Sequence, residues 1–158
     1  MATLHLMVGL PGSGKTTEAM RLAEQAHALR LTPDEWQYQL FGNDFIPDGE
    51  NTEHDRRHTQ IEALMWKTAQ EVLRLGVDVI LDFGFWAREE RDALRAEAQK
   101  LGVGFQIHYT ACSEEELWRR LQIRNRRAGE TPVFRVSREN LREWAAVFQP
   151  PTEKELNG

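Results

Sequence analysis

The chain has 158 residues, of which 41% are hydrophobic and 28% charged, and its formal net charge is -5 at pH 7. This length fits one domain, 1–158, and the composition is that of a globular protein, whereas a protein living on duplex nucleic acid usually presents a basic surface. The single cysteine, Cys112, excludes an internal disulfide and suits a cytoplasmic location, and no apolar run approaches the about 18 residues that a membrane span needs.

The predicted elements of the first third alternate between strands and helices. Apolar runs and helical spacing predict a strand over 3–8, a helix over 18–28, a strand over 29–31, a helix over 34–41 and a loop over 42–51. Thr32 is a candidate cap for the second helix, and Pro33 suits its first turn.

A long helix opens the rest of the chain. Apolar residues recur every three or four positions from Ile61 to Leu75, which predicts one helix over 52–75. The later elements are predicted as a strand over 77–81, a helix over 87–101, a strand over 103–110, a helix over 113–127, a turn over 128–132 and a helix over 137–148. Ser113 and Glu116 have capping-box spacing, and residues 149–158 are expected to be loosely structured.

This alternation predicts an α/β protein with a parallel sheet of four or five strands and right-handed crossovers, covered by helices on both faces. Ligands of such sheets bind at the carboxyl ends of the strands. The residues that follow predicted strands are therefore the candidates for function, namely 9–17, 32–34, 82–86 and 110–113.

One of these segments, Gly9-Leu10-Pro11-Gly12-Ser13-Gly14-Lys15-Thr16, fits the pattern G-x-x-x-x-G-K-[ST] at every position. The glycines let successive backbone N–H groups point at phosphate oxygens, and the following helix presents its positive N-terminus to the same charge. We expect Lys15 to reach the β- and γ-phosphates and the Thr16 hydroxyl to bind Mg²⁺. The pattern, between a strand and a helix, predicts the P-loop NTPase fold with ATP and Mg²⁺, and the expected ATP contacts are Gly9, Pro11, Gly12, Ser13, Gly14, Lys15, Thr16 and Thr17.

Asp82 closes the apolar run of the third predicted strand. A carboxylate beside the phosphate loop can hold Mg²⁺ or its water ligands, or it can orient an acceptor. The alternative is an ordinary turn aspartate. Phe83 follows it where ATP-driven motor proteins usually have a water-activating glutamate, so a motor function is disfavoured.

Asp34 follows the second predicted strand, across the mouth of the expected pocket from the phosphate loop. A carboxylate there can accept the proton of an acceptor hydroxyl, so Asp34 is the candidate catalytic base. The alternative is a first-turn aspartate that is favoured by the helix dipole.

Five arginines crowd one predicted helix: Arg119, Arg120, Arg124, Arg126 and Arg127. Arg120, Arg124 and Arg127 share a helix face, and guanidinium groups suit phosphate and transition-state charge. They predict an Arg-rich lid over about 119–136 that contacts ATP, with Arg120 and Arg124 catalytic. The alternative is a solvated face near a helix C-terminus, where cations are favoured.

Further side chains are candidates for an acceptor pocket. His54 and His58 have the spacing of a metal pair, but no third ligand is evident, so zinc is disfavoured. The start of the long helix lies at the ligand edge of the sheet, which makes Arg57 and His58 candidate substrate contacts beside Asp34 and Asp82. Trp36 and Trp86 follow two strand ends and are candidate walls for an apolar or planar acceptor, with plain packing as the alternative. 

The chain resembles the small P-loop kinases grouped as AAA-type "predicted kinase" ATP-binding proteins, relatives of phage-type polynucleotide 5′-kinase, chloramphenicol phosphotransferase and zeta-toxin kinases. The resemblance runs from about Thr3 to Glu155 and rests on segments 9–17, 32–35, 79–82, 115–127 and 148–152. It implies that Asp34 is the general base, that Arg120 and Arg124 are lid arginines, and that Asp82 is a substrate- or metal-side carboxylate. Polynucleotide kinases carry an arginine shortly after the base, whereas Trp36, Gln37 and Tyr38 follow here.

These observations predict a kinase that moves the γ-phosphate of ATP to a hydroxyl of a small molecule. Two alternatives stay open: a kinase of nucleic-acid 5′-hydroxyl ends, which is less favoured, and a non-catalytic ATP-binding module. A GTPase is disfavoured because no N-K-x-D base-reading motif occurs. No membrane partner is expected.

Overall fold

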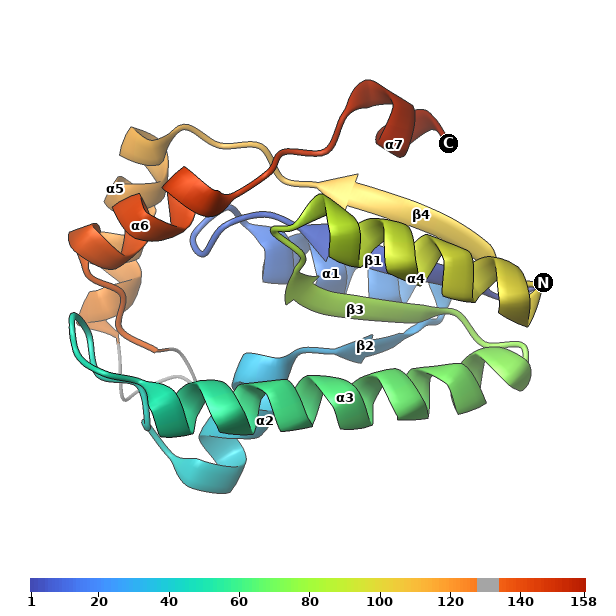
Figure 1. The fold of residues 1–158 in the computed structure, drawn as a ribbon, viewed down its shortest axis with the longest axis horizontal. Coiled ribbons are helices and arrows are strands. Elements are labelled where there is room, and N and C mark those ends of the chain that lie inside the picture. Colours follow the sequence, from blue (N-terminus) through green and yellow to red (C-terminus); the bar gives the residue numbers. More distant parts are fainter. Residues whose placement is uncertain (128–133) are drawn as a thin grey trace.

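The computed structural model describes residues 1–127 and 134–158 (Figure 1). Its elements are β1 (Thr3–Val8), α1 (Lys15–Ala26), β2 (Leu29–Leu31), α2 (Pro33–Phe41), α3 (Thr52–Arg74), β3 (Val79–Gly84), α4 (Arg88–Leu101), β4 (Gly104–Tyr109), α5 (Glu114–Arg126), α6 (Arg138–Val147) and α7 (Glu153–Asn157). The predicted turn at 128–132 and part of the predicted lid lie outside the described residues.

The strands form one parallel sheet in the order β2-β3-β1-β4, which confirms the predicted α/β architecture. Leu6 of β1 pairs with Leu81 of β3 on one side and with Ile107 of β4 on the other. Because β1 is central, the loop that leaves its carboxyl end emerges between the ends of two neighbouring strands. Such a position is the usual ligand crevice of a parallel sheet.

Helices cover both faces of the sheet, as predicted (Figure 1). Successive side chains of a strand point to opposite faces, so Leu4 and Leu6 pack against α3 and α4 while Met7 packs against Ala19 of α1. The α3 side holds the larger core, which includes the fully buried Met65. Helix α3 runs opposite to the strands, and its first turns therefore lie at the carboxyl edge of the sheet.

Helices α5 and α6 stand beyond the carboxyl ends of the strands (Figure 1). They pack together through Leu117, Leu121 and Leu141, and Leu10 of the β1–α1 loop joins the same cluster. A complete capping box between Ser137 and Asn140 fixes the start of α6. The predicted box of α5 is only half formed, because the Glu116 carboxylate pairs with arginines of its own helix.

The C-terminal residues differ from the prediction of a loose tail. They end in α7, whose first turn is closed by a capping box between Thr152 and Glu155. The buried Glu155 carboxylate also forms an ion pair with the buried Arg91 of α4, at 2.9 Å. The ion pair joins residues 64 positions apart, so local composition could not indicate it.

Candidate active site

The β1–α1 loop, residues 9–16, is called the phosphate loop below. Gly12 and Gly14 have φ of 88°, which L side chains rarely adopt. A Cβ atom on Gly9 would lie 2.4 Å from the Thr110 hydroxyl oxygen, so this position also requires glycine. The glycines hold the backbone in a tight loop that leads into the N-terminus of α1 at Lys15.

Asp82 is the polar centre beside the phosphate loop. Its carboxylate lies 2.7 Å from the Lys15 ammonium and accepts hydrogen bonds from Thr16, at 2.7 Å, and Thr32, at 3.0 Å. Burial raises the pKa of Asp82, but the Lys15 charge and these donors outweigh it and hold the pKa below its usual range. Thr32 is the N-cap residue of α2, as predicted, but its hydroxyl donates to Asp82 and makes no cap hydrogen bond.

Asp82 lies inside β3, whereas the sequence predicted that this strand ends before Asp82. The strand continues to Gly84, which pairs with Val8, and the Gly9 N–H donates to the Gly84 carbonyl at 3.1 Å. This pairing carries β3 past the apolar run and fixes the phosphate loop against its end.

The residues present fit a magnesium site that phosphates complete. The Thr16 hydroxyl and the Asp82 carboxylate supply adjacent hard oxygen atoms of the kind that Mg²⁺ prefers. Residues 1–127 and 134–158 contain no group of three His, Cys, Asp or Glu side chains that could hold a metal. A metal here would need nucleotide oxygens and water as its remaining ligands.

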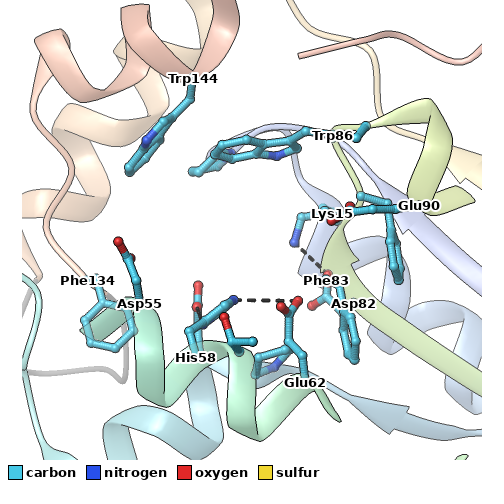
Figure 2. A pocket seen from close by; sticks show the side chains of 18 of the residues that line it. Lys15, Asp55, His58, Glu62, Asp82, Phe83, Trp86, Glu90, Phe134 and Trp144 are labelled. Carbon is cyan, nitrogen blue, oxygen red and sulfur yellow. Dashed lines mark hydrogen bonds and ion pairs between the residues drawn. The ribbon is translucent and has the colours of Figure 1, made fainter. Parts of the chain in front are cut away.

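A cavity of about 860 Å³ opens beside Lys15 (Figure 2). Its wall comes from the phosphate loop, the first turns of α2 and α3, the segment from β3 into α4, and one side each of α5 and α6. This volume lies within the range of small-molecule sites. The cavity brings together side chains that are far apart in the sequence.

Asp34 lines this cavity together with Lys15 and Arg124. The Asp34 side chain is 55% exposed, and its carboxylate lies 3.7 Å from Nδ1 of His58. The side chain thus faces open space near the phosphate loop, as a base for an acceptor hydroxyl would have to do.

His58 and Glu62 form a titratable pair on the cavity wall (Figure 2). His58 Nδ1 lies 3.0 Å from the Gln37 amide oxygen, and Nε2 lies 3.7 Å from the Glu62 carboxylate. Burial lowers the pKa of His58. Burial, with the charges of Glu90 and Asp34, raises the pKa of Glu62 to about 7. Sequence reasoning missed Glu62, although its position one helical turn after His58 was an available signal.

The lid arginines lie in different surroundings. Arg124 lines the cavity, donates to the Phe134 carbonyl at 3.3 Å, and has a buried Nε without a hydrogen-bond partner in the described part of the chain. Burial lowers the pKa of Arg124. Arg120 donates to the Gly12 carbonyl at 3.3 Å, beside the phosphate loop, whereas Arg127 is exposed.

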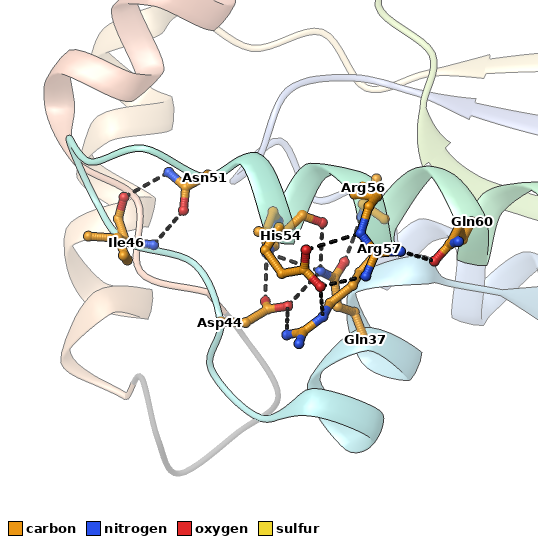
Figure 3. A network of polar contacts seen from close by, with 10 residues as sticks. Gln37, Asp44, Ile46, Asn51, His54, Arg56, Arg57 and Gln60 are labelled. Atoms are coloured by element: carbon orange, nitrogen blue, oxygen red, sulfur yellow. Dashed lines mark hydrogen bonds and ion pairs between the residues drawn. The ribbon is translucent and has the colours of Figure 1, made fainter.

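Two predicted acceptor contacts lie outside the cavity wall. Trp36 on α2 is 41% exposed and does not line the cavity. Arg57 is turned toward the α2–α3 loop, where it pairs with Asp44 at 3.2 Å (Figure 3), and its guanidinium stacks on Phe41 at the end of α2. One residue corresponds to about 100° around a helix, which separates Arg57 from the cavity-facing His58.

Trp86 lines the cavity, and its ring centroid lies 5.6 Å from that of Trp144 on α6. Phe134, Phe45 and Trp66 are further aromatic lining residues. None of these further residues carries a spacing signal in the sequence, because they come from separate elements that only the fold brings together.

A second hollow lies on the other side of the phosphate loop, with a volume of about 490 Å³. Ser13, Thr17 and Glu18 line it from the loop and α1, and residues 108–110 line it from the end of β4. Residues of the phosphate loop therefore line both this hollow and the larger cavity.

Comparison with known proteins identifies the family. The AAA domain family matches residues 4–151, which is most of the chain. The chain belongs to this AAA domain family. The family match, together with kinase-like relatives, confirms the small P-loop kinase resemblance seen in the sequence.

A "probable adenylyl-sulfate kinase" of Aeropyrum pernix is 29% identical over 118 residues, which are 72% of this chain and 61% of the relative. The match therefore spans less than two thirds of the relative's length. A proposed kinase of Chloroflexus aurantiacus superposes with a TM-score of 0.73 and 17% identity, over 96% of this chain and 81% of that one. Kti12 of Chaetomium thermophilum, in complex with ADP-AlF3, superposes with a TM-score of 0.68 and 20% identity, over 96% of this chain and 82% of that one.

These likenesses establish a kinase-like P-loop fold for this member of the family. No helix within residues 1–127 and 134–158 is both long and apolar enough to cross a bilayer.

Proposed function

We propose that this protein is a kinase that transfers the γ-phosphate of Mg-ATP to a hydroxyl group of a small molecule. The observation that carries the proposal is the junction of the phosphate loop with the large cavity. A phosphate held beside Lys15 borders a space of about 860 Å³ in which a second molecule fits. A protein that only binds a nucleotide has no need for such a space.

The proposed roles follow from position. Lys15 and the backbone of the phosphate loop bind the β- and γ-phosphates, and Thr16 and Asp82 bind Mg²⁺ directly or through water. Asp34 orients the acceptor hydroxyl and takes its proton. Arg120 and Arg124 neutralise charge on the transferring group, because Arg120 contacts the phosphate loop and Arg124 lines the cavity.

The adenine base is proposed to occupy the hollow between Thr17 and the end of β4. Phosphates then run along the loop, and the terminal one points into the cavity. The complex of Kti12 with ADP-AlF3 supports nucleotide binding by proteins of this fold. A cytoplasmic location remains part of the proposal.

The deciding experiment measures ADP release with a panel of hydroxyl compounds and detects transfer of a labelled γ-phosphate to the acceptor. Acceptor-dependent release with a mass gain of one phosphoryl group on the acceptor supports the kinase. ATP binding without release for any acceptor would favour the non-catalytic module. Transfer only to 5′-hydroxyl oligonucleotides, weakened by salt, would favour the nucleic-acid kinase.

A further inference from the structure

We infer that the acceptor of the proposed transfer is a cation, a hydroxyl compound that carries an ammonium or similar group bound in the cavity. The inference rests on the proposed function for the words acceptor and transfer, but the charge preference belongs to the cavity itself. Three features carry it: the unbalanced charge of the lining, the placement of the two cations, and the aromatic wall.

The lining is rich in carboxylates. Five carboxylates line the cavity: Asp34, Asp55, Glu62, Asp82 and Glu90. Only two lining side chains in the described part of the chain carry a permanent positive charge, Lys15 and Arg124. Lys15 is already paired with Asp82. In the described part of the chain, no Lys or Arg forms an ion pair with the other four carboxylates, and Asp34 and Glu62 approach only His58, at 3.7 Å each.

The two permanent cations of the lining are also expected to contact ATP and not an anionic acceptor. Lys15 belongs to the phosphate loop, and Arg124 approaches from α5, so bound ATP would engage this side of the cavity. Glu62 on α3 and Glu90 on α4 line the cavity from two other elements, near Lys15 and Asp82 (Figure 2). Burial, with the charges of Glu90 and Asp34, raises the pKa of Glu62 more than the charge of Lys15 lowers it, and no Lys or Arg of the described residues is an ion-pair partner of its carboxylate. A bound cation would supply that partner.

The aromatic wall suits the same ligand. Trp86 and Trp144 lie across the cavity from Glu62 and His58 (Figure 2). Phe134 adds a third ring to the lining. Aromatic faces attract cations, by about 0.5–1 kcal/mol at exposed sites and about 2 kcal/mol or more where water is excluded. An ammonium group between these rings and Glu62 would meet favourable charge from both sides, whereas an anion would meet repulsion.

The test compares hydroxyl compounds of different charge. Amino sugars and aminoglycosides are compared with their N-acetylated derivatives, and gluconate and adenylyl sulfate provide the anionic arm. Binding is followed by tryptophan fluorescence and calorimetry on the full chain, and phosphate transfer is followed in parallel. We expect the amine to bind at least about tenfold more tightly than its acetylated form, an effect of about 1.4 kcal/mol.

A double variant locates the preference. Glu62→Gln with Glu90→Gln should weaken amine binding about tenfold and leave the neutral derivative unaffected. The matched control is Glu89→Gln, an exposed neighbour on α4 that does not line the cavity. Thermal melting of each variant checks that it is folded.

The outcomes separate the two proposals. Tighter binding of neutral or anionic compounds than of amines, or an unchanged preference in the double variant, would overturn the inference about charge. Amine binding without phosphate transfer to any compound would instead overturn the kinase function and leave the charge preference standing.

Discussion

At the scale of single residues, Asp82 holds the phosphate loop and β3 together. Its buried carboxylate binds one ammonium and one hydroxyl group from the start of α1 and a second hydroxyl group from the β2–α2 junction. Removing one partner of a buried pair leaves an uncompensated charge, which is costlier than removing both. Lys15, which is expected to bind phosphate, therefore also has a structural role in the free protein as the partner of Asp82.

For Lys15→Ala we predict loss of turnover together with a lower melting temperature. The orphaned Asp82 keeps its bonds from Thr16 and Thr32, so the expected cost is on the order of 1–3 kcal/mol. Adding Asp82→Asn should recover melting temperature but not activity. Full activity in Lys15→Ala would contradict the proposed phosphate contact, and failure of the double variant to recover would contradict the pairing argument.

For Asp34→Asn we predict a kcat lower by about 10²–10⁴ with ATP affinity nearly unchanged, because the amide keeps the shape and removes the proton acceptor. The side chain is largely exposed, so folding should be little affected. Rapid-quench phosphate transfer and calorimetric ATP titration measure the two effects. An Asp34→Asn protein with undiminished kcat would shift the role of base to another carboxylate of the cavity.

For Arg124→Ala we predict a kcat reduced by several powers of ten, as for arginines that clamp a transferring phosphoryl group. The melting temperature should stay the same or rise, because the variant no longer buries a guanidinium whose Nε has no hydrogen-bond partner among residues 1–127 and 134–158. Arg126→Ala, exposed on the same helix, is the matched control. Early melting with normal kcat per folded molecule would assign Arg124 to the fold alone.

At the scale of elements, local sequence was sufficient where apolar runs and end signals agree. The predicted bounds of β1 and β2 equal those observed, and the start of α3 at Thr52 is also as predicted. The phosphate loop followed from one motif. By contrast, the end of β3, the helix α7 and the aromatic wall depend on partners distant in sequence, such as Gly84 with Val8. Periodicity carries no information about such pairings.

The α7 segment acts on the candidate site through one side chain. Arg91, which is 1% exposed, pairs with Glu155 and donates to the carbonyls of Phe85 and Trp86, at 2.9 and 3.3 Å. Phe85 has φ of 43°, a left-handed conformation that costs energy outside glycine. The C-terminal helix thus helps to hold the strained turn that carries Trp86 into the cavity.

For Glu155→Ala we predict a destabilisation of about 3–5 kcal/mol, since Arg91 is left buried and unpaired. Glu153→Ala is the matched control because it removes an exposed carboxylate from the same first turn. Denaturant unfolding measures both variants. Equal, small effects would show that α7 is dispensable. The tryptophan fluorescence should change only in Glu155→Ala, because Arg91 donates to the Trp86 carbonyl.

At the scale of the whole molecule, three layers deliver their ends to one edge. The phosphate loop, the first turns of α3 and the faces of α5 and α6 meet there because α3 runs opposite to the strands (Figure 1). Their charges also meet, and the cavity collects carboxylates that the fold must keep close together. Folding therefore imposes an electrostatic cost at this site, and that cost depends on pH.

Glu62 gives this cost a defined sign. Its pKa is raised from 4.5 to about 7 in the folded protein, so the native state binds more protons than the unfolded state between these values. The Glu62 contribution to stability is accordingly most favourable below pH 4.5 and declines as pH rises to about 7. We predict that Glu62→Gln has the melting temperature of wild type near pH 4.5 and a higher melting temperature than wild type at pH 8. Each kcal/mol of stability gained should raise the melting temperature by about 2–4 °C.

The difference between the two melting curves isolates Glu62 from groups of opposite sign. His58 and His108 have lowered pKa values, so their contributions to stability are lost as pH falls below about 6.5. This loss is the same in wild type and in Glu62→Gln, apart from the direct contact of His58 with Glu62. Glu71→Gln, exposed on the same helix, controls for the loss of a carboxylate. A melting difference that is flat with pH, or that grows toward acid, would show that Glu62 is ionised throughout. An ammonium ligand should shrink the difference at pH 8, because its charge stabilises the ionised carboxylate.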